Sequence, residues 1–341
     1  MGKSIAYFLW MSAIAIWMTL ASSQAKMAGA ETLAYSGAST GIEKDAGLAP
    51  ETELTVTGGY RRDDLNWNIA GDINGNNPNI ISELTWKDLE SWQLKLQGRL
   101  IWPNLVALKG ALTYGWLFDG RNQDSDYSGN NRTGEFSRSN NTTANEYVWD
   151  ASLAVGYPIR FGRAVIGTLT PLAGYSQHEQ HLKITDGYQT IATPGITPPE
   201  GPIEGLDSTY KTRWRGPWLG IDLQFRAAEI HTFAHRLETY LTYEYHWADF
   251  EAVANWNLNS DFAHPKSFRH DTTGSGFVFG AGINCMLDQH WALNLGFDYQ
   301  DWSTHNGTIK FYLADGATHK QQLNAVNWTS YALMMGLTLR F

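Results

Sequence analysis

The C-terminal segment of the chain constrains its fold most. Alternate positions from Tyr331 to Phe341 are all apolar, whereas most of the positions between them are small or polar. This period of two is that of a β-strand with one face in lipid and the other in a wet lumen. A half-buried strand of a soluble β-sandwich alternates in the same way. The segment therefore predicts a strand, and the rest of the chain must decide between the two classes.

The N-terminal 30 residues predict export. Lys3 precedes an uncharged run at 8–20, and the small residues 28–30 follow, which is the order of a secretory signal peptide. A membrane anchor is the alternative, but the run is shorter than the ~20 residues that a spanning helix needs. We expect residues 1–30 to be a signal peptide and residues 31–50 to be a periplasmic segment.

Composition favours a barrel over a pair of soluble domains. Aromatic residues make up 13% of the chain, with 15 Trp and 16 Tyr, while the mean hydropathy is −0.34. Outer-membrane barrels combine interfacial aromatic rings with polar lumen and loop residues in this way. The single cysteine, Cys285, excludes an intramolecular disulfide framework. The net charge of −9 argues against nucleic acid as a partner and is compatible with cationic partners.

Alternating segments recur along residues 51–341, and we expect about ten antiparallel strands in an up-and-down transmembrane barrel. Trp92 and Trp102 bracket one such segment, and Pro103-Asn104 predicts the turn that follows it. We expect short connections near 103, 160, 231 and 288 and long ones at 120–143, 185–208, 251–271 and 306–325. Many strands exceed the ~9–11 residues that span a bilayer. The barrel should therefore project above the membrane and carry its site there.

Several segments, in order along the chain, resemble those of the omptins, which are endopeptidases on ten-stranded barrels in the outer membrane. The segments are 83–87, 110–116, 124–127, 144–147, 173–175, 210–213, 217–218 and the stretch from 276 to the C-terminus. The resemblance implies an all-β transmembrane barrel in the outer membrane of a Gram-negative bacterium. It also implies a hydrolase that cleaves cationic peptides at basic residues, using a water activated by Asp and His side chains.

The resemblance implies that Asp124 and Asp126 are catalytic, because they match the omptin Asp-x-Asp pair. Strand neighbours two apart point to the same side, and two like charges that close raise one pKa, which suits a shared proton. The alternative interpretation is a pair of solvated loop acids.

The Asp-x-His couple that faces this pair in omptins has no match after Trp247. The nearest substitutes are Asp261 and His264, with His264 as the general base that takes a proton from water. An exposed loop histidine is the alternative interpretation, and His270 beside Asp271 is a further candidate couple.

Three further residues take binding roles from the resemblance. Asp63 lies where an omptin acid receives a basic substrate side chain, although an ion pair with Arg61 or Arg62 would equally account for it. Tyr175 and Arg213 match positions of the family's lipopolysaccharide-binding group. We expect no metal and no organic cofactor, with lipopolysaccharide as the accessory lipid and outer-membrane lipid as a partner.

The missing histidine couple leaves three functions open. The first is an omptin-like endopeptidase, and the second is a proteolytically inactive barrel that serves as an adhesin or envelope protein. The third is a small pore, because inward side chains could either plug a narrow barrel with ion pairs or line a channel. The side chains in question are Lys95, Arg99, Asp150 and Asp298.

Overall fold

The computed structural model describes residues 50–102, 105–162, 166–226 and 236–341. The predicted signal peptide, the periplasmic segment up to residue 49 and the turn at Pro103-Asn104 lie outside the described residues. Within the described ranges, no helix combines the length and the hydropathy needed to cross a bilayer.

Long β-strands make up nearly all of the described chain. They are β1 (Glu51–Ile69), β2 (Ser82–Trp102), β3 (Val106–Gly129), β4 (Thr133–Thr142), β5 (Glu146–Gly156), β6 (Ile159–Phe161), β7 (Ile166–Ile191), β8 (Gly201–Arg226), β9 (Arg236–Asn255), β10 (Phe268–Met286), β11 (Trp291–Thr304), β12 (Gly307–Tyr312) and β13 (Thr318–Arg340), with a short 3-10 turn, η1 (Asn130–Arg132), before β4.

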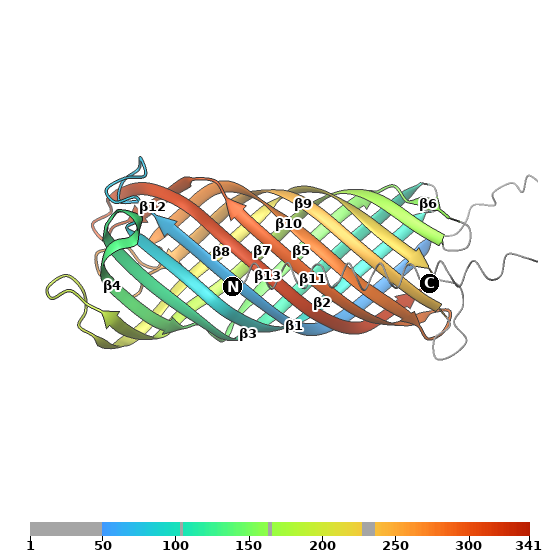
Figure 1. Ribbon diagram of the computed structural model, residues 1–341, viewed down its shortest axis with the longest axis horizontal. Coiled ribbons are helices and arrows are strands. Elements are labelled where there is room, and N and C mark those ends of the chain that lie inside the picture. Colours follow the sequence, from blue (N-terminus) through green and yellow to red (C-terminus); the bar gives the residue numbers. More distant parts are fainter. Residues whose placement is uncertain (1–49, 103–104, 163–165, 227–235) are drawn as a thin grey trace, which may run out of the picture.

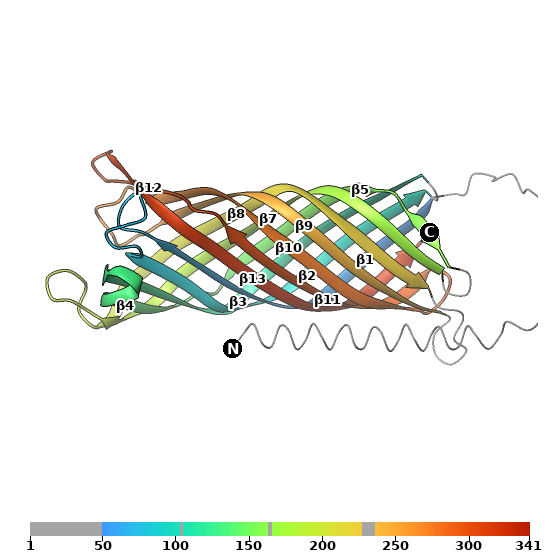
Figure 2. The ribbon, with the colours of Figure 1, turned by 45° about the horizontal axis from the view of Figure 1, so that its top comes forward.

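The strands close into a single antiparallel barrel. Over the described residues the ring holds ten of them in the order β1, β2, β3, β5, β7, β8, β9, β10, β11 and β13, and β13 pairs back onto β1. β4 continues the wall between β3 and β7 above β5, and β12 does the same between β10 and β13. The predicted ten-stranded barrel is confirmed, with every strand tilted along one long cylinder (Figures 1 and 2).

The two ends of the cylinder differ in the length of their strand connections. β4 and β12 lie at one end, and the C-terminus lies at the other (Figure 1). At the C-terminal end β10 and β11 are joined by only the residues 287–290, as predicted. At the other end much of what we predicted as loop at 120–143 and 185–208 is strand, because β3, β7 and β8 continue their ladders there.

The alternation inverts along the long strands such as β1, and this inversion explains why the sequence predicted strands that were too short. In β1 the outward Leu54 and Val56 are exposed, whereas further along it is the inward Leu65, Trp67 and Ile69 that are apolar and buried. The first pattern is that of a wall in lipid, and the second that of a wall in water. The bilayer therefore surrounds the C-terminal end of the cylinder, and the other half projects into water. Because outer-membrane barrels keep their longer loops on the outside, we call this the extracellular half.

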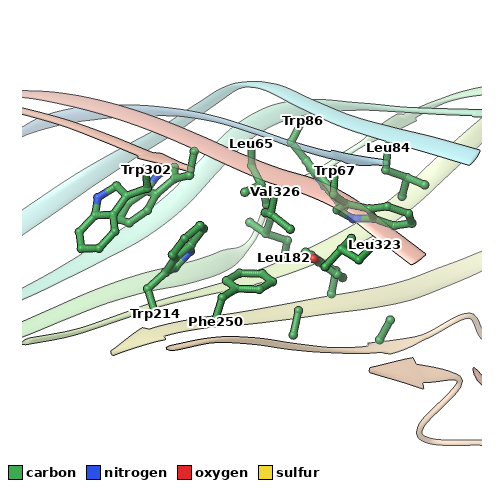
Figure 3. Packing of buried hydrophobic residues seen from close by; sticks show 14 of the residues in the cluster. Leu65, Trp67, Leu84, Trp86, Leu182, Trp214, Phe250, Trp302, Leu323 and Val326 are labelled. Atoms are coloured by element: carbon green, nitrogen blue, oxygen red, sulfur yellow. The ribbon is translucent and has the colours of Figure 1, made fainter. Parts of the chain in front are cut away.

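The extracellular half is filled by side chains, which we call the aromatic core (Figure 3). Trp302 stacks on Trp328 with ring centroids 5.6 Å apart, and Trp214 lies 5.6 Å from Trp302. Trp86 stacks on Tyr210 at 5.1 Å. The aromatic core consists of Leu65, Trp67, Ile69, Leu84, Trp86, Leu89, Leu117, Leu182, Ile184, Tyr210, Trp214, Ala248, Phe250, Ala252, Ala254, Phe268, Trp302, Ile309, Leu323, Val326 and Trp328.

The membrane half encloses polar and charged side chains instead, and we call it the charged lumen. Lys95 Nζ lies 2.6 Å from Asp298 Oδ2, so two of the four side chains predicted to point inward form an ion pair. Lys109 Nζ lies 3.1 Å from Asp222 and 3.3 Å from Glu244. The charged lumen surrounds a cavity of about 130 Å³, which at ~10–15 Å³ for each molecule has room for about ten waters.

Candidate functional site

The predicted acidic pair lies on the part of β3 that stands above the membrane. Asp124 pairs with Leu84 of β2 and Ser139 of β4, and Asp126 pairs with Ser82 and Ser137. Burial raises the pKa of Asp124 well above its usual range, and the charge of Asp126 raises it further. Burial also raises the pKa of Asp126, although hydrogen bonds from the hydroxyls of Ser82 and Ser137 act against that shift.

Asp124 lines a pocket of about 380 Å³ at the extracellular rim, which we call the rim pocket. Its other walls come from β4, β7, β8 and the segment that follows β9. The lining residues are Asp124, Ser137, Ser139, Asn141, Ile184, Gln189, Pro198, Ile203, Leu206, Ser208, Trp256, Leu258, Asn259 and Ser260. Ile184 belongs to the aromatic core, and Leu206 and Trp256 pack against it, so the core forms the floor of the pocket.

Two buried oxygens of the rim pocket have no hydrogen-bond partner among the described residues. They are Asp124 Oδ1 and Asn141 Oδ1. The amide nitrogen of Asn141 donates to Asn122 Oδ1 at 2.8 Å and to Ser139 Oγ at 3.0 Å. A buried polar atom without a partner is unfavourable, so these acceptors mark where a hydrogen-bond donor is missing.

The predicted base, His264, lies on the exposed segment between β9 and β10. Its Nδ1 is 2.8 Å from Asn255 Oδ1. Asp261 is also exposed, and its backbone N–H donates to Asn259 Oδ1 at 3.0 Å. Neither residue lines the rim pocket, and no histidine of the described ranges does. The structure thus brings Asp124 to a pocket without bringing the predicted base into its lining.

The second candidate couple is split between the two faces of β10. His270 points inward into the aromatic core, with its Nδ1 3.0 Å from Tyr210 Oη and its ring centroid 4.9 Å from that of Trp67. Burial lowers the pKa of His270 to about 3, so the ring is neutral at physiological pH. Asp271 is exposed on the opposite face and pairs with Arg269. Adjacent residues in a strand face apart and cannot form such a couple.

The top of β9 shows what replaces the omptin couple. After the outward Trp247, the inward positions are Ala248, Phe250, Ala252 and Ala254, and all of them are buried in the aromatic core. Asp249 and Glu251 face outward between them. The interior at this height therefore holds an apolar core and no acid or histidine from this strand.

Asp63 lies on the inner wall below the aromatic core. Its Oδ1 is 2.9 Å from Arg61 Nε, and its Oδ2 accepts from Arg61 Nη2 at 3.0 Å and from Gln180 Nε2 at 3.2 Å. Arg61 also reaches Asp150 at 2.6 Å. The ion pair considered as the alternative for Asp63 is therefore present, and the carboxylate is only 2% exposed.

Tyr175 and Arg213 lie on the outer wall. Tyr175 on β7 is 53% exposed, and Arg213 on β8 donates to Glu251 Oε2 at 2.9 Å, an oxygen that Arg269 also approaches at 3.0 Å. Lipopolysaccharide binding by these residues stays a prediction. Sequence reasoning did not identify Asn141, Ser139 and Ser208 of the rim pocket, because isolated polar residues in predicted loops carry no motif.

Residues 55–341 match the family described as Protochlamydia outer membrane protein, or Pom. The chain belongs to this Pom family. No curated protein sequence matches it.

The Pom-family chain is similar in fold to a solved outer-membrane barrel. The outer membrane protease OmpT from Escherichia coli superposes with a TM-score of 0.69 at 12% identity, covering 88% of this chain and all of OmpT. The outer membrane protein OprG from Pseudomonas aeruginosa matches with a TM-score of 0.31 at 13% identity, covering 86% of this chain and 96% of OprG. Family and fold identify an outer-membrane barrel, and they leave its activity open.

Proposed function

We propose that this Pom-family barrel is not a protease and that it binds a ligand at its extracellular rim. The observation that carries the proposal is the aromatic core. Water-mediated peptide cleavage needs a cleft in which a base and the acidic pair face a substrate. Here the inward positions of β9 that would face Asp124 across the interior are Ala248, Phe250 and Ala252.

The aromatic core also supports a binding role. Its stacked rings pack strands from all sides of the ring, so the extracellular half is a rigid support for the segments above it. Sites on rigid elements hold their geometry better than sites on free loops. The rim pocket lies directly on this support.

A cleavage assay tests the first part of the proposal. The refolded protein in lipopolysaccharide is given a fluorogenic peptide with paired basic residues, alongside the variants Asp126→Asn and His264→Ala. We expect no cleavage above background from any of the three proteins once heat-modifiable mobility has shown that each is folded. Cleavage by the wild type that is lost in both variants would establish an omptin-type protease and overturn the proposal.

A narrow pore is a second candidate, favoured by the cavity of about 130 Å³ within the charged lumen. Single-channel recording in planar bilayers separates this function from the first. A pore predicts stepwise conductance from the wild type, whereas a barrel closed by the aromatic core predicts none. In the second case, conductance that appears only in Trp214→Ala would assign the closure to the core.

A further inference from the structure

The rim pocket differs from the charged lumen in whether its carboxylates have basic partners. In the lumen Asp63 pairs with Arg61, Asp298 with Lys95, and Asp222 and Glu244 with Lys109. Buried carboxylates are stable when they are paired in this way. Asp124 pairs with no base of the described chain, and none of the described residues that line its pocket is basic. A positive charge opposite Asp124 would therefore have to come from a ligand.

The unpartnered polar atoms of the pocket also favour a cationic ligand that donates hydrogen bonds. Both of its buried unpartnered atoms, Asp124 Oδ1 and Asn141 Oδ1, are acceptors. A ligand that satisfies both must bring several donors. An ammonium group has three donors and no acceptor, so it supplies charge and hydrogen bonds together.

The remaining walls fit an alkyl stem attached to such a group. Ile203, Leu206, Trp256 and Leu258 line the pocket beside the polar residues, and Ile184 forms part of its floor. A volume of about 380 Å³ is in the range of small-molecule sites. Apolar walls with a few convergent polar atoms are the usual composition of such sites.

We propose that the rim pocket binds a primary alkylammonium group, with Asp124 as its counter-ion and Asn141 as a second acceptor. The inference rests on the proposed binding role of the rim and names the ligand chemistry. It replaces the water-activating role that the sequence predicted for Asp124. Because the ligand occupies the pocket without a covalent step, no base is required.

Proton release accompanies binding in this arrangement. Burial and the charge of Asp126 hold Asp124 protonated to a higher pH than an exposed aspartate, and the incoming ammonium favours the ionised form. Asp126 on the same strand and Glu135 on β4 are the other acids of this region. The remaining lining residues are not ionisable. Affinity should therefore rise with pH through the titration of Asp124 and fall again where the amine itself loses its proton, near pH ~10.

The test is a calorimetric titration of the refolded full mature chain with n-pentylamine at pH 7.5. Two probes of the same chain length separate the contributions: 1-pentanol has no charge, and pentyltrimethylammonium has the charge without N–H donors. We expect saturable binding of one pentylamine for each barrel and affinities at least about tenfold weaker for both controls.

Two variants and a matched control assign the site. Asp124→Asn should weaken pentylamine binding at least about tenfold, and Asn141→Leu should weaken it severalfold. Heat-modifiable electrophoretic mobility should show that both variants are folded. Asp315→Asn removes an exposed acid between β12 and β13 that does not line the pocket, and it should leave the affinity unchanged.

Three results would overturn the ammonium site: equal binding of 1-pentanol, equal binding of pentyltrimethylammonium, or wild-type affinity in both Asp124→Asn and Asn141→Leu. Absence of any binding would overturn it as well. These outcomes are independent of the peptide-cleavage assay. A protease would therefore be recognised by cleavage, whatever the amine titration gives.

Discussion

The extracellular and membrane halves of this barrel share the same strands and have opposite interiors. Above the membrane the inner wall is apolar and the rings of Trp214, Trp302 and Trp328 pack against one another. Within the membrane the inner wall is charged, and Lys109 holds two acids around a cavity. The medium outside decides which side each residue type occupies, because apolar side chains face lipid where there is lipid and face inward where there is water.

The two halves are also stabilised in different ways. The aromatic core gives stability through close packing and apolar burial, at about 1.5–3 kcal/mol for each large side chain. The stability of the charged lumen depends on each buried charge having a partner of opposite charge. Breaking one element in each half therefore tests the comparison directly.

The largest effect should come from Trp214→Ala, which opens a cavity in the aromatic core. Trp214 is fully buried, and removing a buried aromatic ring costs about 3–5 kcal/mol of the free energy of unfolding. Urea titration in liposomes, followed by electrophoretic mobility, measures the change. Trp92→Ala is the matched control, because Trp92 lies on the outer wall with 59% of its surface exposed. Equal losses in the two variants would mean that the extracellular interior is not a packed core.

A smaller loss is expected from Lys109→Met in the charged lumen. The change leaves Asp222 and Glu244 without the cation that lies 3.1 Å and 3.3 Å from them. Asp222 keeps a contact to Arg99 at 3.9 Å, and Glu244 keeps one to His246 at 3.3 Å. Losing one of two partners beside water should therefore cost about 1–3 kcal/mol of the free energy of unfolding. The same urea titration applies, with the exposed Lys320→Met as control. A loss as large as that of Trp214→Ala would show that the cavity excludes water.

The inversion of the alternating pattern also determines how much of the fold could be predicted from the sequence. The membrane half was predictable, because outward apolar rows such as that from Tyr331 to Leu339 keep one phase over the whole membrane-spanning part of a strand. The extracellular strands were missed at 120–143 and 185–208, since there the apolar phase moves to the inner face and becomes mixed with serine, threonine and asparagine. For a barrel that projects from the bilayer, the length of a strand can be predicted only if a change in the phase of its apolar alternation is taken into account.

The candidate site was predictable only in part. The resemblance to omptins singled out Asp124 and Asp126, and their spacing of two along a strand predicted that the two carboxyl groups interact. The rim pocket could not be predicted, because its walls come from β4, β7, β8 and the segment after β9. Which residues of these strands lie side by side depends on how the barrel closes. The inward phase of β9 explains why Phe250 and Ala252 fill the interior while Glu251 faces solvent.

A pH-dependent loss of stability is expected from His270 in the aromatic core. Its folded pKa of about 3 lies below the ordinary value of 6.5. Between these values the unfolded chain binds a proton that the folded chain does not, so the contribution is intact above pH 6.5 and falls on acidification. From pH 6.5 to 5.5 the loss is about 1 kcal/mol.

The variant His270→Gln removes this dependence because it cannot take up the proton. Urea midpoints measured at several values between pH 4.5 and 7.5 should fall less steeply for His270→Gln than for the wild type. His264→Gln changes an exposed histidine and should leave the slope as it is. A wild-type slope in His270→Gln would mean that water reaches this ring, contrary to a sealed extracellular interior.

The smallest effect belongs to Asp124→Asn, and its sign distinguishes the rim pocket from the charged lumen. The folded pKa of Asp124 is raised, so the folded protein keeps a proton that the unfolded chain releases above pH ~3.9. Stability therefore falls as pH rises through the window between the unfolded and the folded pKa. Asp124→Asn should make the barrel slightly more stable at pH 7.5 and leave it unchanged at pH 3, as measured by urea midpoints, whereas Asp261→Asn should change neither. If Asp124→Asn instead weakened the barrel at pH 7.5, the carboxylate would have a favourable partner in the protein itself, and the rim would be balanced in the same way as the lumen below it.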